Sequence, residues 1–179
     1  MTLILHTCCA PCSAAIIEWL LCNGMTPVLF FYNPNIYPQS EYILRRNEVV
    51  NYAKKIGVEI IEGDDNYIGW LEQVSGLEHE PERGARCLQC FKIRMLATAR
   101  LANVRHISMF ATSLAASRQK NIEQIAQAGH WAAAHFCGLQ FFQKNWRKGG
   151  LNEQRYKLLK ENNFYNQRYC GCNFKSQNI

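Results

Sequence analysis

The chain has 179 residues, of which 48% are hydrophobic and 19% charged, and its formal net charge at pH 7 is +6. This length suits one well-packed domain, and the composition is that of a globular protein rather than of a disordered or repetitive chain. No apolar run reaches the roughly 18 residues of a membrane-spanning helix, and no basic region precedes the short apolar segment at residues 3–5. We therefore expect one domain, residues 1–179, in the cytoplasm, without a signal peptide or a membrane partner.

Short apolar runs alternate with helical patterns from the start of the chain. Residues 2–5 and 27–32 are continuous apolar runs, and apolar residues recur at helical spacing between residues 13 and 23. This pattern predicts a strand, a helix and a second strand. Neither strand alternates polar with apolar residues, as is typical of parallel strands that helices cover on both faces.

The same alternation continues to the end of the chain. Helices are predicted over residues 40–56, 66–74, 87–102, 120–128 and 151–162, and strands over residues 58–61, 106–111 and 139–142. Gly57 and Gly129 are expected to end two of the helices. The alternation predicts a three-layer α/β fold, with a mostly parallel sheet flanked by helices, of the Rossmann-like or nucleotide-hydrolase-like type. In such sheets ligands bind at the carboxyl ends of the strands, where Cys8 and Cys9 would lie.

Two cysteine pairs have the spacing of metal ligands. Nine cysteines in a chain without an export signal favour metal or redox chemistry over a disulfide framework. Cys87 and Cys90 begin a predicted helix, whose N-terminus and neighbouring arginines favour the thiolate. The adjacent Cys8 and Cys9 suit a polynuclear cluster, because each can bind a different iron. These four cysteines would complete a set that both a 4Fe-4S cluster and tetrahedral zinc accept, and buried free thiols are the alternative.

A third pair, Cys170 and Cys172, is separated by one glycine. A disulfide across so small a ring is strained and easily reduced, which is typical of catalytic disulfides, although a second set of metal ligands is the alternative. Cys12, in the first turn of a predicted helix, is expected to pack in the core, with a site or second-metal role left open. Cys22 and Cys137 have no partner spacing, and we expect both in the core.

The positive charge is concentrated at the end of the chain. From about residue 141 the sequence has two acids, Glu153 and Glu161, against eight basic residues, whereas the remaining twelve basic residues are balanced by twelve acids. The eight are Lys144, Arg147, Lys148, Arg155, Lys157, Lys160, Arg168 and Lys175. Such a segment favours a polyanionic partner such as nucleic acid, and a solvated helix face is the alternative. Residues 145–148 mix an aromatic with cations, as single-stranded nucleic-acid surfaces do.

Other polar residues carry weaker signals. His6, in a buried strand, is expected to be a hydrogen-bonded core histidine rather than a ligand. A polar run that opens a helix could hold a phosphate on backbone N–H groups or simply cap the helix, and it comprises Ser113, Ser117, Arg118, Lys120 and Asn121. The sequence has no GxxxxGK[ST], GxGxxG, HExxH or GxSxG motif, which counts against common nucleotide-binding, zinc-protease and serine-hydrolase sites.

Five stretches taken together resemble a known family. They are LHTCCAPCS at residues 5–13, YNPNIYPQSEYILR at 32–45, EPERGARCLQCFKIR at 80–94, TSL at 112–114 with Ser117, Lys120 and Asn121, and YCGC at 169–172. In this order they resemble the QueH family of epoxyqueuosine reductases over nearly the whole chain.

The resemblance implies a single catalytic domain that reduces epoxyqueuosine to queuosine in tRNA without cobalamin, as the final step of queuosine biosynthesis. It implies that a 4Fe-4S cluster is bound by Cys8, Cys9, Cys87 and Cys90. Cys170 and Cys172 would cycle between dithiol and disulfide, and an additional iron, whose ligands the resemblance does not identify, would lie near the cluster. The partners would be tRNA and an electron donor. A zinc- or ATP-dependent tRNA-thiolation enzyme and a zinc-stabilised RNA-binding module are the alternatives.

Overall fold

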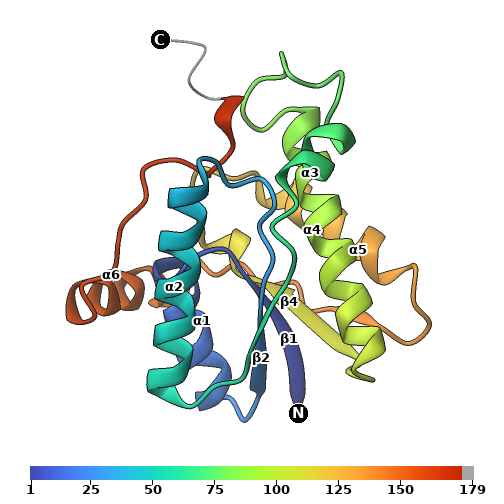
Figure 1. The fold of residues 1–179 in the computed structure, drawn as a ribbon. Coiled ribbons are helices and arrows are strands. Elements are labelled where there is room, and N and C mark those ends of the chain that lie inside the picture. The colour runs from blue at the N-terminus through green and yellow to red at the C-terminus, as the bar shows by residue number, and fades with distance from the viewer. Residues whose placement is uncertain (175–179) are drawn as a thin grey trace.

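The centre of the computed structural model, which describes residues 1–174, is a five-stranded parallel sheet (Figure 1). The strands are ordered β3-β2-β1-β4-β5, and every neighbouring pair is parallel. Their bounds are Thr2–Thr7 for β1, Thr26–Phe31 for β2, Ile60–Glu62 for β3, Met109–Thr112 for β4 and Gln140–Phe141 for β5.

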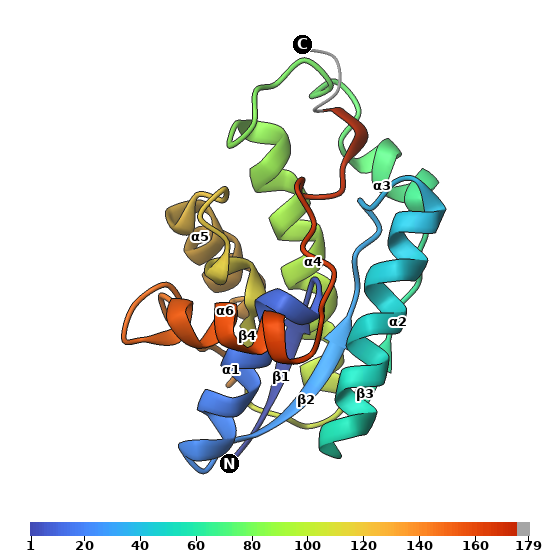
Figure 2. The same cartoon turned by 90° about the vertical axis from the view of Figure 1, so that its left-hand side faces the viewer.

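Helices cover both faces of this sheet, which confirms the expected three-layer α/β fold. On one side lie α1 (Ala10–Cys22), α2 (Gln39–Ile56) and α6 (Leu151–Glu161), and on the other lie α4 (Ala85–Val104) and α5 (Ile122–Ala133) (Figures 1 and 2). The short α3 (Tyr67–Gln73) and the 3-10 helix η1 (Ser113–Ala116) complete the described elements. Within residues 1–174, no helix combines the length and apolar character that crossing a membrane requires.

The two central strands form the core beneath the candidate site. After its exposed first residue, each of β1 and β2 is buried at every position, so the continuous apolar runs mark strands covered on both faces, as predicted. Burying each large aliphatic side chain of this kind stabilises the fold by about 1.5–3 kcal/mol. The strands are therefore a rigid support for the residues that follow them.

The order of the strands reverses at β1. The chain passes from β1 outward to β2 and β3, and then crosses to β4 on the other side of β1. Ligands bind at such switch points in parallel sheets. Cys8 follows β1 and Ser113 follows β4, and the Cys8 backbone N–H donates to the Ser113 hydroxyl at 3.1 Å. The first cysteines thus lie where the fold places a site.

Two helix bounds differ from the expected ones by more than two residues. Helix α1 begins at Ala10, three residues earlier than predicted, because Pro11 is tolerated in the first turn. Helix α5 starts after Asn121 and continues through Gly129 to Ala133, so the prediction that Gly129 ends it was wrong. A Cβ at Gly129 would collide with the ring of Phe141. This glycine allows close packing of α5 on β5.

The chain after α6 crosses the carboxyl edge of the sheet and then runs toward α3 and α4 (Figure 2). We call residues 164–174 the strap. Two buried guanidinium N–H groups of Arg45 donate to the carbonyls of Tyr169 and Cys170 at 3.1 and 3.2 Å, and Tyr37 N–H donates to the Gly171 carbonyl at 2.9 Å. These anchors are made to the main chain of the strap and fix the position of the cysteine pair.

Candidate active site

Cys8, Cys9 and Cys12 form a compact trio where β1 passes into α1, with Cys12 in the first turn of the helix. Among residues 1–174 they are the one group of three or more His, Cys, Asp or Glu side chains whose ligand atoms all lie within 4.8 Å of one another. All three are buried, and the Sγ atoms of Cys8 and Cys9 are 3.7 Å apart. The trio can bind a metal, and its closeness suits one ion. Cys12, left open by the sequence, belongs to this site.

The trio favours one thiolate and two thiols. Hydrogen bonds from Cys12 and Cys9 hold the pKa of Cys8 well below its usual range. Burial raises the pKa of Cys9, and the hydrogen bond to Cys8 raises that of Cys12 to about 11. The Ser113 hydroxyl lies 3.4 Å from the Cys8 sulfur and can donate to it. Cys8 is therefore the sulfur prepared to bind a metal or to react.

The strap closes over this trio through Gln167. Its amide Nε2 lies 2.6 Å from the Cys9 sulfur and 3.9 Å from that of Cys12, and its Oε1 is buried without a hydrogen-bond partner in the described chain. An amide N–H aimed at a sulfur stabilises the thiolate form. Sequence reasoning missed Gln167.

Cys87 and Cys90 lie in the first turns of α4, as predicted. The preceding loop is held by the buried Arg86, which donates to the carbonyls of Leu77, Glu78 and Glu80 at 2.7–3.2 Å. Burial raises the pKa of both thiols, although Arg83 and Arg86 lower that of Cys87 as expected and Arg94 lowers that of Cys90. Desolvation of the charged form outweighs those favourable fields.

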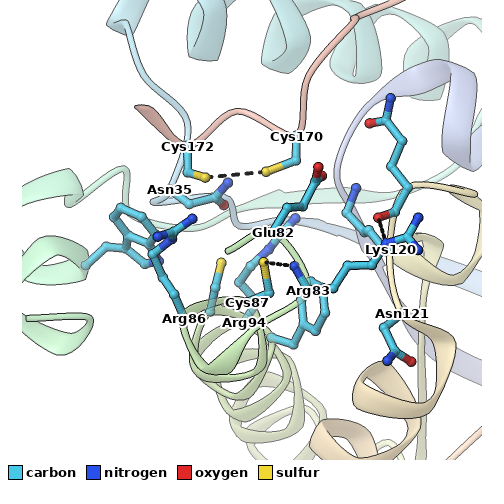
Figure 3. Close-up of a pocket in the computed structure, with 14 residues that line it drawn as sticks. Asn35, Glu82, Arg83, Arg86, Cys87, Arg94, Lys120, Asn121, Cys170 and Cys172 are labelled. Carbon is cyan, nitrogen blue, oxygen red and sulfur yellow. Dashed lines mark hydrogen bonds between the residues drawn. The ribbon is translucent and has the colours of Figure 1, made fainter. Parts of the chain in front are cut away.

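Cys170 and Cys172 face Cys87 and Cys90 across a small cavity (Figure 3). The cavity measures about 30 Å³, which holds one or two water molecules. The two strap sulfurs are 3.6 Å apart and both thiols are free. The hydrogen bond between the two sulfurs lowers the pKa of Cys170 well below its usual range and raises that of Cys172.

The structure groups the cysteines differently from the expected ligand set. Cys8 and Cys9 cluster with Cys12, whereas Cys87 and Cys90 share their cavity with the strap pair. No four-cysteine group within the distance of a single ion exists among residues 1–174. In a 4Fe-4S cluster each cysteine binds a different iron, so the ligand sulfurs lie further apart than around a single ion. A cluster bound by Cys8, Cys9, Cys87 and Cys90 therefore stays a prediction.

A second and larger cavity opens on the other side of Cys170. It measures about 360 Å³ and is lined by the loop after η1, by α6 and by the strap. Cys8 and Cys12 also line it. Four residues line both cavities, namely Arg94, Gln119, Lys120 and Cys170.

Lys120 lies between the two groups of sulfurs. Burial alone would lower its pKa, but the negative charges of the Cys8 and Cys170 thiolates outweigh burial and raise it. Lys120 in turn lowers the pKa of both Cys8 and Cys170. The lysine is therefore a permanent cation that stabilises a thiolate in each group.

His6 is a hydrogen-bonded core histidine, as expected. Its ring nitrogens lie 2.8 Å from the Thr112 hydroxyl and 3.0 Å from the Tyr32 carbonyl oxygen. Burial and the charge of Arg94 lower its pKa to about 3, so the ring is neutral at physiological pH. His6 thus links the carboxyl ends of β1, β2 and β4, and the guanidinium of Arg94 lies against its ring.

Several peripheral predictions need correction. Cys22 and Cys137 are exposed rather than in the core, because they lie at the end of α1 and in the turn after α5. Trp146 is buried, and its indole donates to the Thr112 carbonyl at 3.0 Å, so residues 145–148 do not present an aromatic surface to nucleic acid. Asn121 caps α5 by accepting from two backbone N–H groups, which confirms the capping interpretation for this residue.

The basic segment divides into cations with different roles. Lys144 covers the ring of Trp19 at 4.2 Å, Arg147 donates to carbonyls of the loop before α5, and Lys157 pairs with Glu161. Arg155 and Arg168 line the large cavity. Lys175 lies outside the described residues. One feature of the sequence could have indicated that the strap lines a basic site: residues 162–174 contain no Asp or Glu.

Comparisons with known proteins agree on one family. A family model described as epoxyqueuosine reductase QueH matches residues 3–178. The epoxyqueuosine reductases QueH of Acinetobacter baylyi and Haemophilus influenzae are 42% and 40% identical to this chain over 170 residues, which cover 95% of this chain and 78% and 69% of theirs. That of Thermotoga maritima is 35% identical over 176 residues, covering 97% of this chain and 89% of its own.

Proposed function

This chain belongs to the QueH family of epoxyqueuosine reductases, and we propose that it removes the epoxide oxygen of epoxyqueuosine in tRNA, without cobalamin, using the Cys170–Cys172 pair and an iron–sulfur cluster. It is an oxidoreductase, and the product, queuosine, completes the biosynthetic sequence. The reductase name of every relative described above disfavours the thiolation-enzyme and RNA-binding-module alternatives.

The observation that carries this proposal is the free Cys170–Cys172 pair with unequal pKa values. Cys170, whose pKa is lowered, is the nucleophilic thiolate, and Cys172, whose pKa is raised, keeps its proton. The sulfurs are 3.6 Å apart, within reach of a disulfide after a small movement. Cys170 also borders the large cavity, where a substrate can approach it.

The dithiol balances the reaction. Removing the epoxide oxygen breaks two C–O bonds and forms one C=C bond, which requires two electrons and two protons. Oxidation of the Cys170 thiolate and the Cys172 thiol to a disulfide releases two electrons and one proton, solvent supplies the second proton, and the oxygen leaves as water. An external electron donor then returns the disulfide to the dithiol.

The cysteines present fit an iron–sulfur cluster in their chemistry. All seven at this edge of the sheet are free thiols, and Arg94 and Lys120 lie among them as compensating cations. We propose Cys8, Cys9, Cys87 and Cys90 as the cluster ligands. We place an additional iron beside the cluster at Cys12, where it would share the sulfurs of Cys8 and Cys9. When bound, the cluster would supply one-electron transfer, and the additional iron would supply Lewis acidity toward an oxygen.

Iron content and turnover of two variants test this division of roles. Protein purified without oxygen should be brown, contain several irons with sulfide per chain, and convert epoxyqueuosine to queuosine in an RNA hairpin. Cys170→Ser should keep its iron and lose turnover, because its hydroxyl cannot form a disulfide. Cys87→Ser should lose iron.

Cys22→Ser is the matched control, because this thiol is exposed and lies outside both cavities. It should keep both iron and turnover. Equal loss of iron in Cys170→Ser and Cys87→Ser would instead identify the strap pair as metal ligands. Colourless wild-type protein with one zinc would overturn the cluster proposal.

A further inference from the structure

We propose that the large cavity beside Cys170 is the pocket for one nucleotide turned out of a single-stranded RNA loop, and that Arg118, Arg155 and Arg168 bind the phosphates on either side of it. This inference rests on the proposed function and adds the way in which the RNA reaches the thiols. It places RNA recognition at the cavity rather than along the whole basic segment.

The charges around the cavity carry the first step. Six cations line it and no Asp or Glu does. Two are engaged inside the protein, since Arg45 pairs with Glu41 at 2.6 Å and Arg94 donates to Asn33. The remaining four are Arg118, Lys120, Arg155 and Arg168, and none of them forms an ion pair within residues 1–174. Cations gathered without acids attract a polyanion.

Arg155 gives a second, independent observation. Its Nε is buried and has no hydrogen-bond partner among the described residues. A buried donor without a partner costs free energy, which a bound acceptor would recover. Arg155 comes from α6 and Arg168 from the strap, whereas Arg118 comes from the loop before α5. Three separate segments therefore each contribute an arginine to the lining of one cavity, and guanidinium suits phosphate because it can donate two hydrogen bonds at once.

Size distinguishes this cavity from the small cavity between the two cysteine pairs. About 360 Å³ falls in the range of roughly 300–1,000 Å³ that ligand pockets occupy. The cavity between the two cysteine pairs, at about 30 Å³, excludes a nucleotide. A third cavity, of about 370 Å³, is lined by Glu62, Asp64 and Asp65 and by no cysteine, so it would repel RNA.

The lining also suits a nucleobase. Tyr156 is about half exposed at the opening, with the Arg155 guanidinium 5.2 Å from its ring centroid, and such faces stack on bases. Asn152 and Asn166 offer amide groups that can hydrogen-bond the edges of a base. Cys8, Cys12 and Cys170 lie on the same lining, so a base that enters the cavity is brought to the sulfurs.

The test measures binding of an RNA hairpin that carries an unmodified guanine at the target position, so that it does not depend on turnover. Arg155→Ala and Arg168→Ala should each weaken binding roughly tenfold, the loss of one charge-assisted hydrogen bond. Each should also reduce the slope of log affinity against log salt by about 0.7, the value for one phosphate contact in a single strand. Arg155→Lys should recover part of the affinity.

Two lysines provide controls. Lys54→Ala removes an exposed cation at the far end of α2 and should bind like wild type. Lys160→Ala removes an exposed cation from α6 outside the cavity, and its effect should be much smaller than that of Arg155→Ala. Equal effects of Lys160→Ala and Arg155→Ala would overturn the pocket in favour of a diffuse basic surface.

Cross-linking tests the position of the base itself. A hairpin with 4-thiouridine at the target position should cross-link to residues that line the cavity, Tyr156 above all, and cross-links confined to other parts of the chain would overturn the proposal. Failure of the wild type to reduce epoxyqueuosine would overturn the proposed function, whereas normal turnover with unchanged binding by the arginine variants would overturn only the pocket.

Discussion

The two cavities on either side of Cys170 differ in almost every property. The small cavity measures about 30 Å³ and lies between the cysteine pair of α4 and the cysteine pair of the strap. The large cavity measures about 360 Å³ and is lined by six cations. They share the wall formed by Arg94, Gln119, Lys120 and Cys170. Cys170 is the one cysteine of the described chain that lines both cavities, so under the proposed function the dithiol and the substrate would meet at this residue.

The largest effect is expected from Cys172→Ser, which alters the small cavity alone. Without the second thiol no disulfide can form, so turnover should fall at least a thousandfold, of the order seen when a covalent catalytic group is removed. Affinity for RNA should stay within twofold of wild type. Single-turnover kinetics and fluorescence anisotropy check the two quantities, and a parallel loss of RNA affinity would show that the cavities do not act separately.

Gly171→Ala should have the next largest effect, because it disturbs the shared wall. Gly171 has a φ of 117°, and an added Cβ would lie 2.8 Å from Ile36 Cγ1. The strain should lower the free energy of unfolding by about 1–3 kcal/mol and displace both thiols, reducing turnover by roughly tenfold to a hundredfold.

Gly76→Ala is the control for backbone strain, since Gly76 has a φ of 82° with no atom within 4 Å of the added Cβ. It should be destabilised by a similar strain while turnover is unchanged. Thermal unfolding and turnover of the two variants separate strain from displacement. Normal turnover of Gly171→Ala would mean that this turn does not position the pair.

Arg147→Met should disturb the lining of the large cavity more than that of the small cavity. Arg147 donates to the carbonyls of Ala115, Ser117 and Lys120, and so holds the loop that carries Arg118. Loss of these bonds should lower the free energy of unfolding by about 2 kcal/mol and RNA affinity severalfold.

Arg147→Lys should not restore stability, because one ammonium group cannot reach three carbonyls in the geometry of a guanidinium. Denaturant unfolding and RNA binding are the measurements. If the lysine variant equals wild type in both, the positive charge matters and the arrangement of donors does not.

The smallest effect is expected from Glu48→Gln, which touches neither cavity. Glu48 accepts from Tyr165 N–H at 2.6 Å, and burial raises its pKa above the usual value. The folded protein therefore favours the protonated acid and loses stability as the pH rises through that pKa. Glutamine cannot ionise, so the variant should gain stability over wild type as the pH rises from 4.5 to 7, by about 1 kcal/mol or less.

Unfolding in urea at several pH values measures this difference. Turnover should be unchanged, because the contact lies at the start of the strap, away from both cavities. A difference in stability that is constant with pH would show that Glu48 has the same pKa in the folded and the unfolded protein, and would contradict the raised pKa.

Much of the fold followed from the sequence because its strands and helices are marked by strong periodicity. The run Leu3–Leu5 and the prolines and glycines between elements located strands and helices to within a few residues. The wrongly predicted end of α5 depended on a contact far away in the sequence. Gly129 reads as a helix stop, yet its role is set by the ring of Phe141.

The candidate site was only partly predictable. Cysteine spacing selected six cysteines as candidates, but spacing does not show which cysteines lie close together in the fold. The proximity of Cys12 to Cys8 depends on the turn of the backbone after β1. The large cavity could not be foreseen, because it is assembled from three segments that are distant in the chain. In the sequence Arg155 has the pattern of a solvent-facing helix cation, and only the fold brings it next to the strap.

The strap also controls access to one of the sulfurs that it crosses. Gln167 lies against Cys9, so the Cys9 sulfur is covered while the strap is docked. The anchors of the strap include hydrogen bonds from Arg45 and Tyr37 to its main-chain carbonyls, and none of these bonds involves a cysteine side chain. The strap is therefore held in place by contacts that do not depend on the chemistry of the thiols beneath it.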